Sequence, residues 1–172
     1  MTDAPSGLRR LDESGLPLLL ARLVVGGAFI SLGALKLRDP VAFLKALREY
    51  DMFPVAHPWL MNATAAALPG AEITCGLLLL AGVAVRGTAL FLLAMLLVFT
   101  TAIAARASAV AHEKSLALCA VAFDCGCGAG VQNACRKLAE NTGLILLCLL
   151  ALASRSRRWC WRGALLRRGP AS

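Results

Sequence analysis

The sequence predicts an all-α integral membrane protein, a bundle of four transmembrane helices. The chain of 172 residues is 59% hydrophobic and only 16% charged, with a mean hydropathy of +0.71. Soluble domains are about half apolar and about a quarter charged. Four apolar stretches also follow one another along the chain, separated by charged or Gly- and Pro-containing segments. We expect a polar tail over 1–15, one membrane domain over 16–154 and a basic tail over 155–172.

The first apolar stretch, 16–36, is close to the length that a bilayer core of about 30 Å requires. It contains Arg22, whose side chain must either reach the membrane surface or find an internal ion-pair partner. In the next segment, 37–59, apolar residues recur at helical spacing beside charged ones, and Pro40 suits a first helical turn. This pattern predicts a short amphipathic helix on the periplasmic surface of the membrane.

The second span is expected over 63–85, with an early interruption at 68–70. Glu72 is the candidate counter-ion of Arg22, although a carboxylate at the lipid headgroups would need no partner. A turn at 85–87 leads to an uncharged third span over 88–105, which Arg106 ends. The sequence alone does not decide between a Glu72 paired with Arg22 and a Glu72 at the lipid headgroups.

The region before the last helix mixes polar and apolar pieces. Its apolar octet 116–123 is too short to span a membrane and suits a strand, a re-entrant piece or an interfacial lid. A fourth helix is expected from Asn133, as its N-cap, to about residue 154. Because the apolar part of this helix is short, we expect it to enter the lipid late.

The basic tail sets the predicted topology. Arg155, Arg157 and Arg158 directly follow the last helix, and Trp159 and Trp161 lie among the basic residues, a pattern typical of a cytoplasmic helix end. Four spans then place both termini in the cytoplasm of a bacterium, with the protein in its inner membrane. The formal charge of +8 fits lipid headgroups better than nucleic acid, because the basic residues are not interleaved with exposed aromatic ones.

Three cysteines in the polar, Gly-rich stretch 123–135 are the candidate catalytic residues: Cys125, Cys127 and Cys135. Two cysteines one residue apart can form a small, strained disulfide that exchanges readily. Cys135 would lie in the first turn of the fourth helix, where the helix dipole favours a thiolate, and is the expected attacking thiol. A purely structural disulfide and a metal site that includes His112 are the alternatives. The metal site is disfavoured, since paired zinc ligands are typically two to four residues apart.

Several segments resemble a known family. Residues 22–40, RLVVGGAFISLGALKLRDP, followed by Phe43, Tyr50 and Pro54, are similar to the opening of DoxX-like membrane proteins, and the Pro69–Glu72 segment resembles their second helix. The element Asp124-Cys-Gly-Cys, followed by Cys135 and a leucine-rich helix, resembles the MauE, or methylamine-utilisation, branch. The resemblance covers roughly 16–153. One difference is Gly128-Ala129, where that branch is expected to have Phe-Gly.

This resemblance implies a four-helix inner-membrane protein that supports the maturation of a periplasmic redox enzyme. In the MauE branch the client is the disulfide-rich subunit of methylamine dehydrogenase, together with a thioredoxin-like partner. Analogy with other four-helix thiol oxidoreductases suggests quinone as an electron acceptor, an argument from fold alone.

Three functions therefore compete. The first is thiol–disulfide exchange through Cys125, Cys127 and Cys135. The second is a non-catalytic scaffold that holds a client enzyme through the surface helix and the basic tail. The third, least favoured, is a small transporter in which Arg22 and Glu72 line a polar path.

Overall fold

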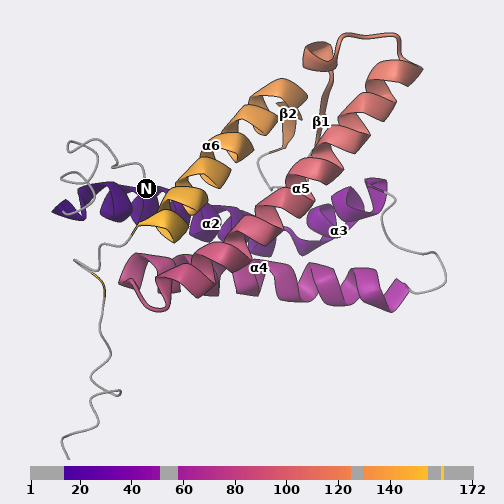
Figure 1. The fold of residues 1–172 in the computed structure, drawn as a ribbon. Helices are drawn as coiled ribbons and strands as arrows, with labels where there is room; N and C mark the ends of the chain where they lie inside the picture. Colours follow the sequence, from indigo (N-terminus) through magenta and orange to yellow (C-terminus); the bar gives the residue numbers. More distant parts are fainter. Residues whose placement is uncertain (1–13, 51–57, 125–129, 155–159, 161–172) are drawn as a thin grey trace, which may run out of the picture.

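The computed structural model describes residues 14–50, 58–124, 130–154 and 160. Within these residues the chain forms helices joined by short connections, with a small two-stranded sheet before the last helix (Figure 1). The elements are α2 (Leu16–Arg38), α3 (Pro40–Glu49), α4 (Pro58–Ala81), α5 (Val85–Glu113), the 3₁₀ turn η1 (Leu118–Ala120), β1 (Ala122–Asp124), β2 (Val131–Asn133) and α6 (Ala134–Ala153).

Three of the described helices, α2, α4 and α5, are long and apolar enough to cross a membrane. The chain is thus a multi-pass membrane protein in contact with the lipid bilayer. α6 belongs to the same bundle, but its first two turns carry Arg136, Lys137 and Glu140. Its apolar part is shorter than the roughly 20 residues of a full span, so the fourth crossing stays a prediction.

The helix bounds differ from the expected ones at the second and third spans. α4 runs from Pro58 to Ala81 without a break at Pro69, because neighbouring helices can compensate for a proline inside a membrane helix. The turn after α4 comes earlier than expected, with positive φ angles of 73° at Gly82 and 46° at Ala84. α5 begins directly after this turn and extends to Glu113, well beyond the expected end at Arg106.

Glycines let α2 and α4 approach closely along their length. A Cβ atom added to Gly26 would lie 2.9 Å from the carbonyl oxygen of Gly76, and one added to Gly33 would lie 2.9 Å from that of Pro69. Small residues at such crossings let the backbones of membrane helices pack directly against each other. This contact fixes α2 and α4 as an antiparallel pair.

Successive long helices run in alternating directions through the bundle. Arg22, near the start of α2, donates hydrogen bonds to the end of α4, and Arg86, at the start of α5, donates one to the carbonyl oxygen of Ser154 after α6. At the opposite end, Ala107 in the last turns of α5 packs against Ala134 at the start of α6. We call the first end the Arg22 end and the second the disulfide end.

The buried core of the bundle is formed by apolar side chains from the four long helices, including Val25, Phe29, Leu79, Leu92 and Cys148. Many large apolar side chains instead point outward, among them Leu20, Leu23, Val24, Leu77, Leu90, Phe91, Leu97, Val98, Leu146 and Leu149. Such a continuous apolar exterior is stable in lipid and unusual for a soluble domain.

The amphipathic helix α3 covers the bundle near the disulfide end. Asp39 caps it by accepting a hydrogen bond from the backbone N–H of Ala42, 2.9 Å away, and Pro40 occupies the first turn as expected. Its apolar side chains Phe43, Ala46 and Leu47 are buried. The apolar face of α3 therefore packs against protein, whereas its amphipathic pattern predicts contact with the membrane surface.

The short sheet and η1 form a cap at the disulfide end. β1 and β2 pair antiparallel, with Ala122 opposite Asn133 and Asp124 opposite Val131. The octet 116–123 therefore contains all of η1, the first two residues of β1 and the connections beside them. Asn133 is the N-cap of α6, and its side chain accepts a hydrogen bond from the N–H of Arg136 at 3.2 Å, as the sequence predicts.

Candidate functional site

The site begins with a disulfide bond between Cys119 and Cys135. Cys119 lies in η1, and Cys135 is the second residue of α6, in the first turn where the sequence places it. The side chain of Asn133 donates a hydrogen bond to the carbonyl oxygen of Cys119, and the N–H of Ala134 donates one to Val121. Together these contacts hold η1 against the start of α6.

The two sulfurs have different surroundings. Cys119 is exposed, whereas Cys135 is half-buried at the N-terminus of α6. The unpaired N–H groups and the dipole at a helix N-terminus stabilise a negative charge. A thiolate released at Cys135 would therefore be stabilised by α6, while an incoming thiol reaches Cys119 more easily.

The predicted pair Cys125 and Cys127 lies outside the described residues. The two strands that flank this segment, β1 and β2, pair antiparallel. Within the described part of the chain, no group of three or more His, Cys, Asp and Glu side chains could hold a metal ion. His112 is exposed near the end of α5.

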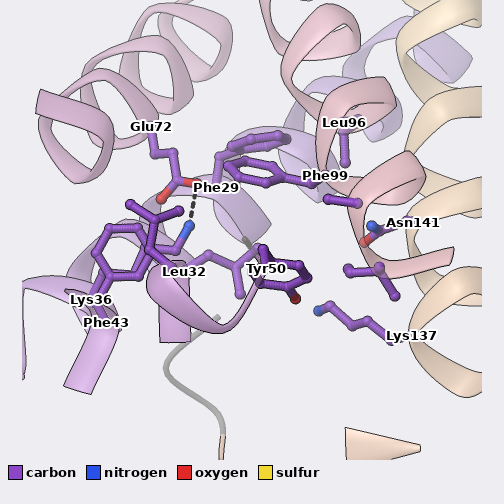
Figure 2. A pocket seen from close by; sticks show the side chains of 13 residues that line it. Phe29, Leu32, Lys36, Phe43, Tyr50, Glu72, Leu96, Phe99, Lys137 and Asn141 are labelled. Carbon is purple, nitrogen blue, oxygen red and sulfur yellow. Dashed lines mark hydrogen bonds and ion pairs between the residues drawn. The ribbon is translucent and has the colours of Figure 1, made fainter. Parts of the chain in front are cut away.

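Beneath this cap lies a chamber of about 50 Å³, enclosed by α2, α3, α4, α5 and α6. Aromatic rings form much of its wall, and Tyr50 also packs edge-on against Phe123 of β1, with ring centres 6.5 Å apart. Tyr50 lines the chamber (Figure 2), so its ring contacts both the chamber and the cap. Its lining residues are Phe29, Leu32, Lys36, Phe43, Leu47, Tyr50, Glu72, Leu96, Phe99, Ala102, Ile103, Lys137 and Asn141.

A buried ion pair between Lys36 and Glu72 forms one side of the chamber. The two side chains are only 5% and 1% exposed, and the ammonium group lies 5.2 and 5.1 Å from the ring centres of Phe43 and Phe99. Cation–π attraction to both rings adds to the ion pair. Only Oε1 of Glu72 takes part in the pair, and Oε2 is buried without a hydrogen-bond partner among the described residues.

The opposite side of the chamber is formed by the first turns of α6 (Figure 2). Lys137 is buried, and its ammonium group lies 3.5 Å from a carboxylate oxygen of Glu140, which is more exposed. The side-chain amide of Asn141 donates a hydrogen bond to the hydroxyl of Thr100 on α5, 3.1 Å away. These contacts place one cationic and one amide group opposite Glu72.

The expected ion pair between Arg22 and Glu72 is wrong, because each side chain has a different partner. Arg22 is buried and donates from Nε to the carbonyl oxygen of Leu79 at 2.8 Å and from Nη2 to that of Leu80 at 2.6 Å. The last carbonyls of a helix lack partners within that helix, so a guanidinium group stabilises the end of α4. Glu72 lies about two helical turns earlier in α4, where Lys36 reaches it.

Residues 14–154 match the family described as "Methylamine utilisation protein MauE". The chain belongs to the MauE family. The match includes all the helices of the bundle, the cap with its disulfide, and the chamber. Comparison of this MauE-family chain with curated proteins gives no match. Comparison with solved structures gives none either.

Two residues of the MauE-family site, Lys36 and Cys119, are not among the candidate site residues that the sequence predicts, although each leaves a signal. Lys36 appears in the sequence only as the end of the first apolar stretch. The second helix runs antiparallel past that end, and the long lysine side chain reaches Glu72 near the middle of α4. Cys119 lies within an apolar octet, and only the return of this octet to the start of α6 brings it to Cys135. The Lys36–Glu72 pair and the Cys119–Cys135 disulfide both join segments that are distant in the sequence, so local sequence patterns do not predict them.

Proposed function

We propose that this MauE-family protein exchanges disulfides with a protein client outside the cytoplasm, in support of the maturation of a periplasmic redox enzyme for methylamine utilisation. The observation that carries the proposal is the Cys119–Cys135 disulfide, which joins an exposed sulfur to one at a helix N-terminus. We propose further that the protein lies in the inner membrane with both termini in the cytoplasm. The wider DoxX-like relationship is part of the same proposal.

The exchange begins with a client thiolate that attacks the exposed sulfur of Cys119. A mixed disulfide forms, the Cys119–Cys135 bond breaks, and Cys135 leaves as a thiolate. Helix α6 stabilises this leaving group through its N-terminal N–H groups. The second client thiol then attacks the mixed disulfide, so that the client gains a disulfide while Cys119 and Cys135 gain its two electrons and end as thiols. The same steps in reverse would reduce a client disulfide.

We propose Cys125 and Cys127 as a second dithiol in the exchange. In the sequence they lie between β1 and β2, the two strands that lie between Cys119 and Cys135. In the proposed sequence this dithiol takes the place of the client thiols in the same exchange with Cys119, becomes a disulfide, and oxidises a client dithiol in turn. A thioredoxin-like or disulfide-rich protein is the client class that this chemistry suits.

The reduction potential of the Cys119–Cys135 disulfide tests this function. Purified protein in detergent micelles is equilibrated with graded glutathione or dithiothreitol buffers, and the thiols are trapped by isotope-coded alkylation and mapped by mass spectrometry. Exchange-active disulfides have potentials between about −120 and −270 mV, whereas structural ones usually lie below about −300 mV. We expect Cys119 and Cys135 to be reduced together within the first range.

The buried thiol of Cys148 is the internal control, because it forms no disulfide in the structure and is expected to show no redox dependence. A Cys119–Cys135 bond that stays oxidised below −300 mV would contradict the exchange function. The scaffold function, in which this disulfide only fixes the cap, would then be favoured.

A further inference from the structure

We infer that the chamber beneath the cap binds the head group of a membrane-soluble quinone, which takes the electrons that the thiols receive. The inference rests on the proposed exchange function and adds a binding site to it. Its starting observation is Oε2 of Glu72, a buried acceptor atom with no hydrogen-bond partner among the described residues. Buried polar atoms normally have partners, so a ligand with a hydroxyl donor, such as a quinol, would satisfy this one.

Charge favours an uncharged ligand. The ammonium group of Lys36 already lies against Glu72 and the rings of Phe43 and Phe99, where it would repel a second cation. An anion would be repelled by the carboxylate of Glu72, and the second cation in the lining, Lys137, already lies 3.5 Å from a carboxylate oxygen of Glu140. A neutral ring is repelled by neither the ammonium group nor the carboxylate, and its binding transfers no further charge out of water.

The polar groups of the chamber suit a ring with oxygens at both ends. Glu72 faces the chamber from α4, and Lys137 and Asn141 face it from α6 on the opposite side (Figure 2). The oxidised ring would accept a hydrogen bond from Lys137 at one carbonyl oxygen. Once the ring has gained two electrons and two protons, Glu72 would accept a hydrogen bond from the new hydroxyl at the other end. The aromatic rings between these groups offer apolar surface to the ring plane.

The chamber alone is too small for a quinone ring, so the bound ring would extend into an adjoining groove. The chamber's own volume of about 50 Å³ is smaller than the roughly 150 Å³ cavity that accepts benzene. An open groove of about 360 Å³ adjoins it and shares the lining residues Leu32 and Lys137. The groove lies between α2 and α6, and its other lining residues are the apolar Ala28 and Leu144 and the polar Ser31 and Glu140. Together the two spaces reach the size of ordinary ligand sites, about 300–1,000 Å³.

The chamber lies close to the thiols that would supply the electrons. Cys135 precedes Lys137 by two residues in the first turn of α6, so the disulfide and the chamber share one helix end. In the proposed step, the two thiols of Cys119 and Cys135 lose two electrons and two protons and form their disulfide bond. The quinone gains these electrons and protons and becomes a quinol with two new O–H bonds.

Photolabelling of the full-length protein in nanodiscs tests the site. The probe is an azido derivative of decylubiquinone, with excess decylubiquinone or menadione as competitors, and the labelled peptides are identified by mass spectrometry. We expect saturable labelling on residues of α3 and of the first half of α6, displaced by both competitors. Labelling elsewhere, or labelling that neither competitor displaces, would overturn the inference.

Leu32→Trp is the blocking variant, because Leu32 lines both the chamber and the groove. Leu20→Trp is the matched control on the same helix, at a side chain that is 53% exposed on the outer surface. We expect Leu32→Trp to lower labelling at least tenfold, and Leu20→Trp to change it less than twofold. Equal labelling of the two variants would contradict the proposed site, and mapping of the wild-type label decides the question if Leu32→Trp does not fold.

The outcomes distinguish this inference from the exchange function. Redox-dependent alkylation of Cys119 and Cys135 without specific labelling would refute the quinone site and leave thiol exchange standing. Specific labelling with a Cys119–Cys135 bond that never changes its redox state would refute thiol exchange.

Discussion

Lys36 and Glu72 are the residues whose chemistry most affects the stability of the site. Each is almost fully buried, and each compensates the charge of the other. Removing one partner of a buried ion pair leaves an uncompensated charge, which costs about 3–5 kcal/mol in proteins. The aromatic rings around the ammonium group add a second reason for the lysine to stay in place.

Substitution of one partner should therefore be more harmful than substitution of both. We expect Lys36→Met to lower the free energy of unfolding by about 3–5 kcal/mol. The double variant Lys36→Met, Glu72→Leu should recover most of this loss, because apolar side chains of similar volume replace the pair. Denaturant titration in detergent micelles, followed by circular dichroism, measures both effects.

Lys45→Met is the matched control for this pair of variants, because Lys45 is exposed on the neighbouring helix α3. Its effect should stay within about 0.5 kcal/mol. A loss at Lys36 as small as that at Lys45 would show that the buried ion pair does not stabilise the bundle.

At the scale of the elements, the crossing of α2 and α4 sets the distance between the walls of the chamber. A Cβ atom on Gly26 would lie 2.8 Å from Cγ of Leu80 and 2.9 Å from a backbone oxygen of α4, whereas one on Gly27 would meet nothing within 4 Å. The two neighbouring glycines thus separate the effect of packing from that of helix propensity.

We expect Gly26→Ala to destabilise the bundle by about 1–3 kcal/mol, because the helices must move apart. Gly27→Ala should be neutral or stabilising by up to about 1 kcal/mol, since alanine favours helix more than glycine does. The same titration in micelles compares the two variants. If both gave the same change in unfolding free energy, the close α2–α4 contact would not be a source of stability.

Local sequence signals predict the elements better than they predict their contacts. The N-cap at Asn133 and the helix after Pro40 follow from residues within one turn, and both are present. The predicted Arg22–Glu72 pair is wrong because it rests on opposite charge alone. The glycine contacts set an antiparallel register of α2 and α4 in which Arg22 lies beside Leu79 instead. The partner of Cys135 depends on the return of an apolar octet, and periodicity does not show which way that octet folds.

The whole molecule is a helical bundle with two chemically different ends. At the Arg22 end, a guanidinium group caps α4 and also donates to the sulfur of Cys160, 3.5 Å away. At the disulfide end lie the cap, the chamber and the buried Lys36–Glu72 pair. Because successive long helices alternate in direction, Ser14 and Cys160 belong to the Arg22 end and the disulfide to the other.

The exchange function requires the disulfide end to face the outside of the inner membrane. Because the two ends carry different cysteines, labelling of these cysteines from one side of the membrane tests this requirement. Spheroplasts that express the protein are treated with dithiothreitol, washed, and labelled with a membrane-impermeant maleimide, and each cysteine is identified by mass spectrometry. If the disulfide end faces outward, Cys119 and Cys135 are labelled in intact spheroplasts only after reduction, and Cys160 is labelled only after permeabilisation. Labelling of Cys160 in intact spheroplasts, with Cys119 and Cys135 labelled only after permeabilisation, would contradict it.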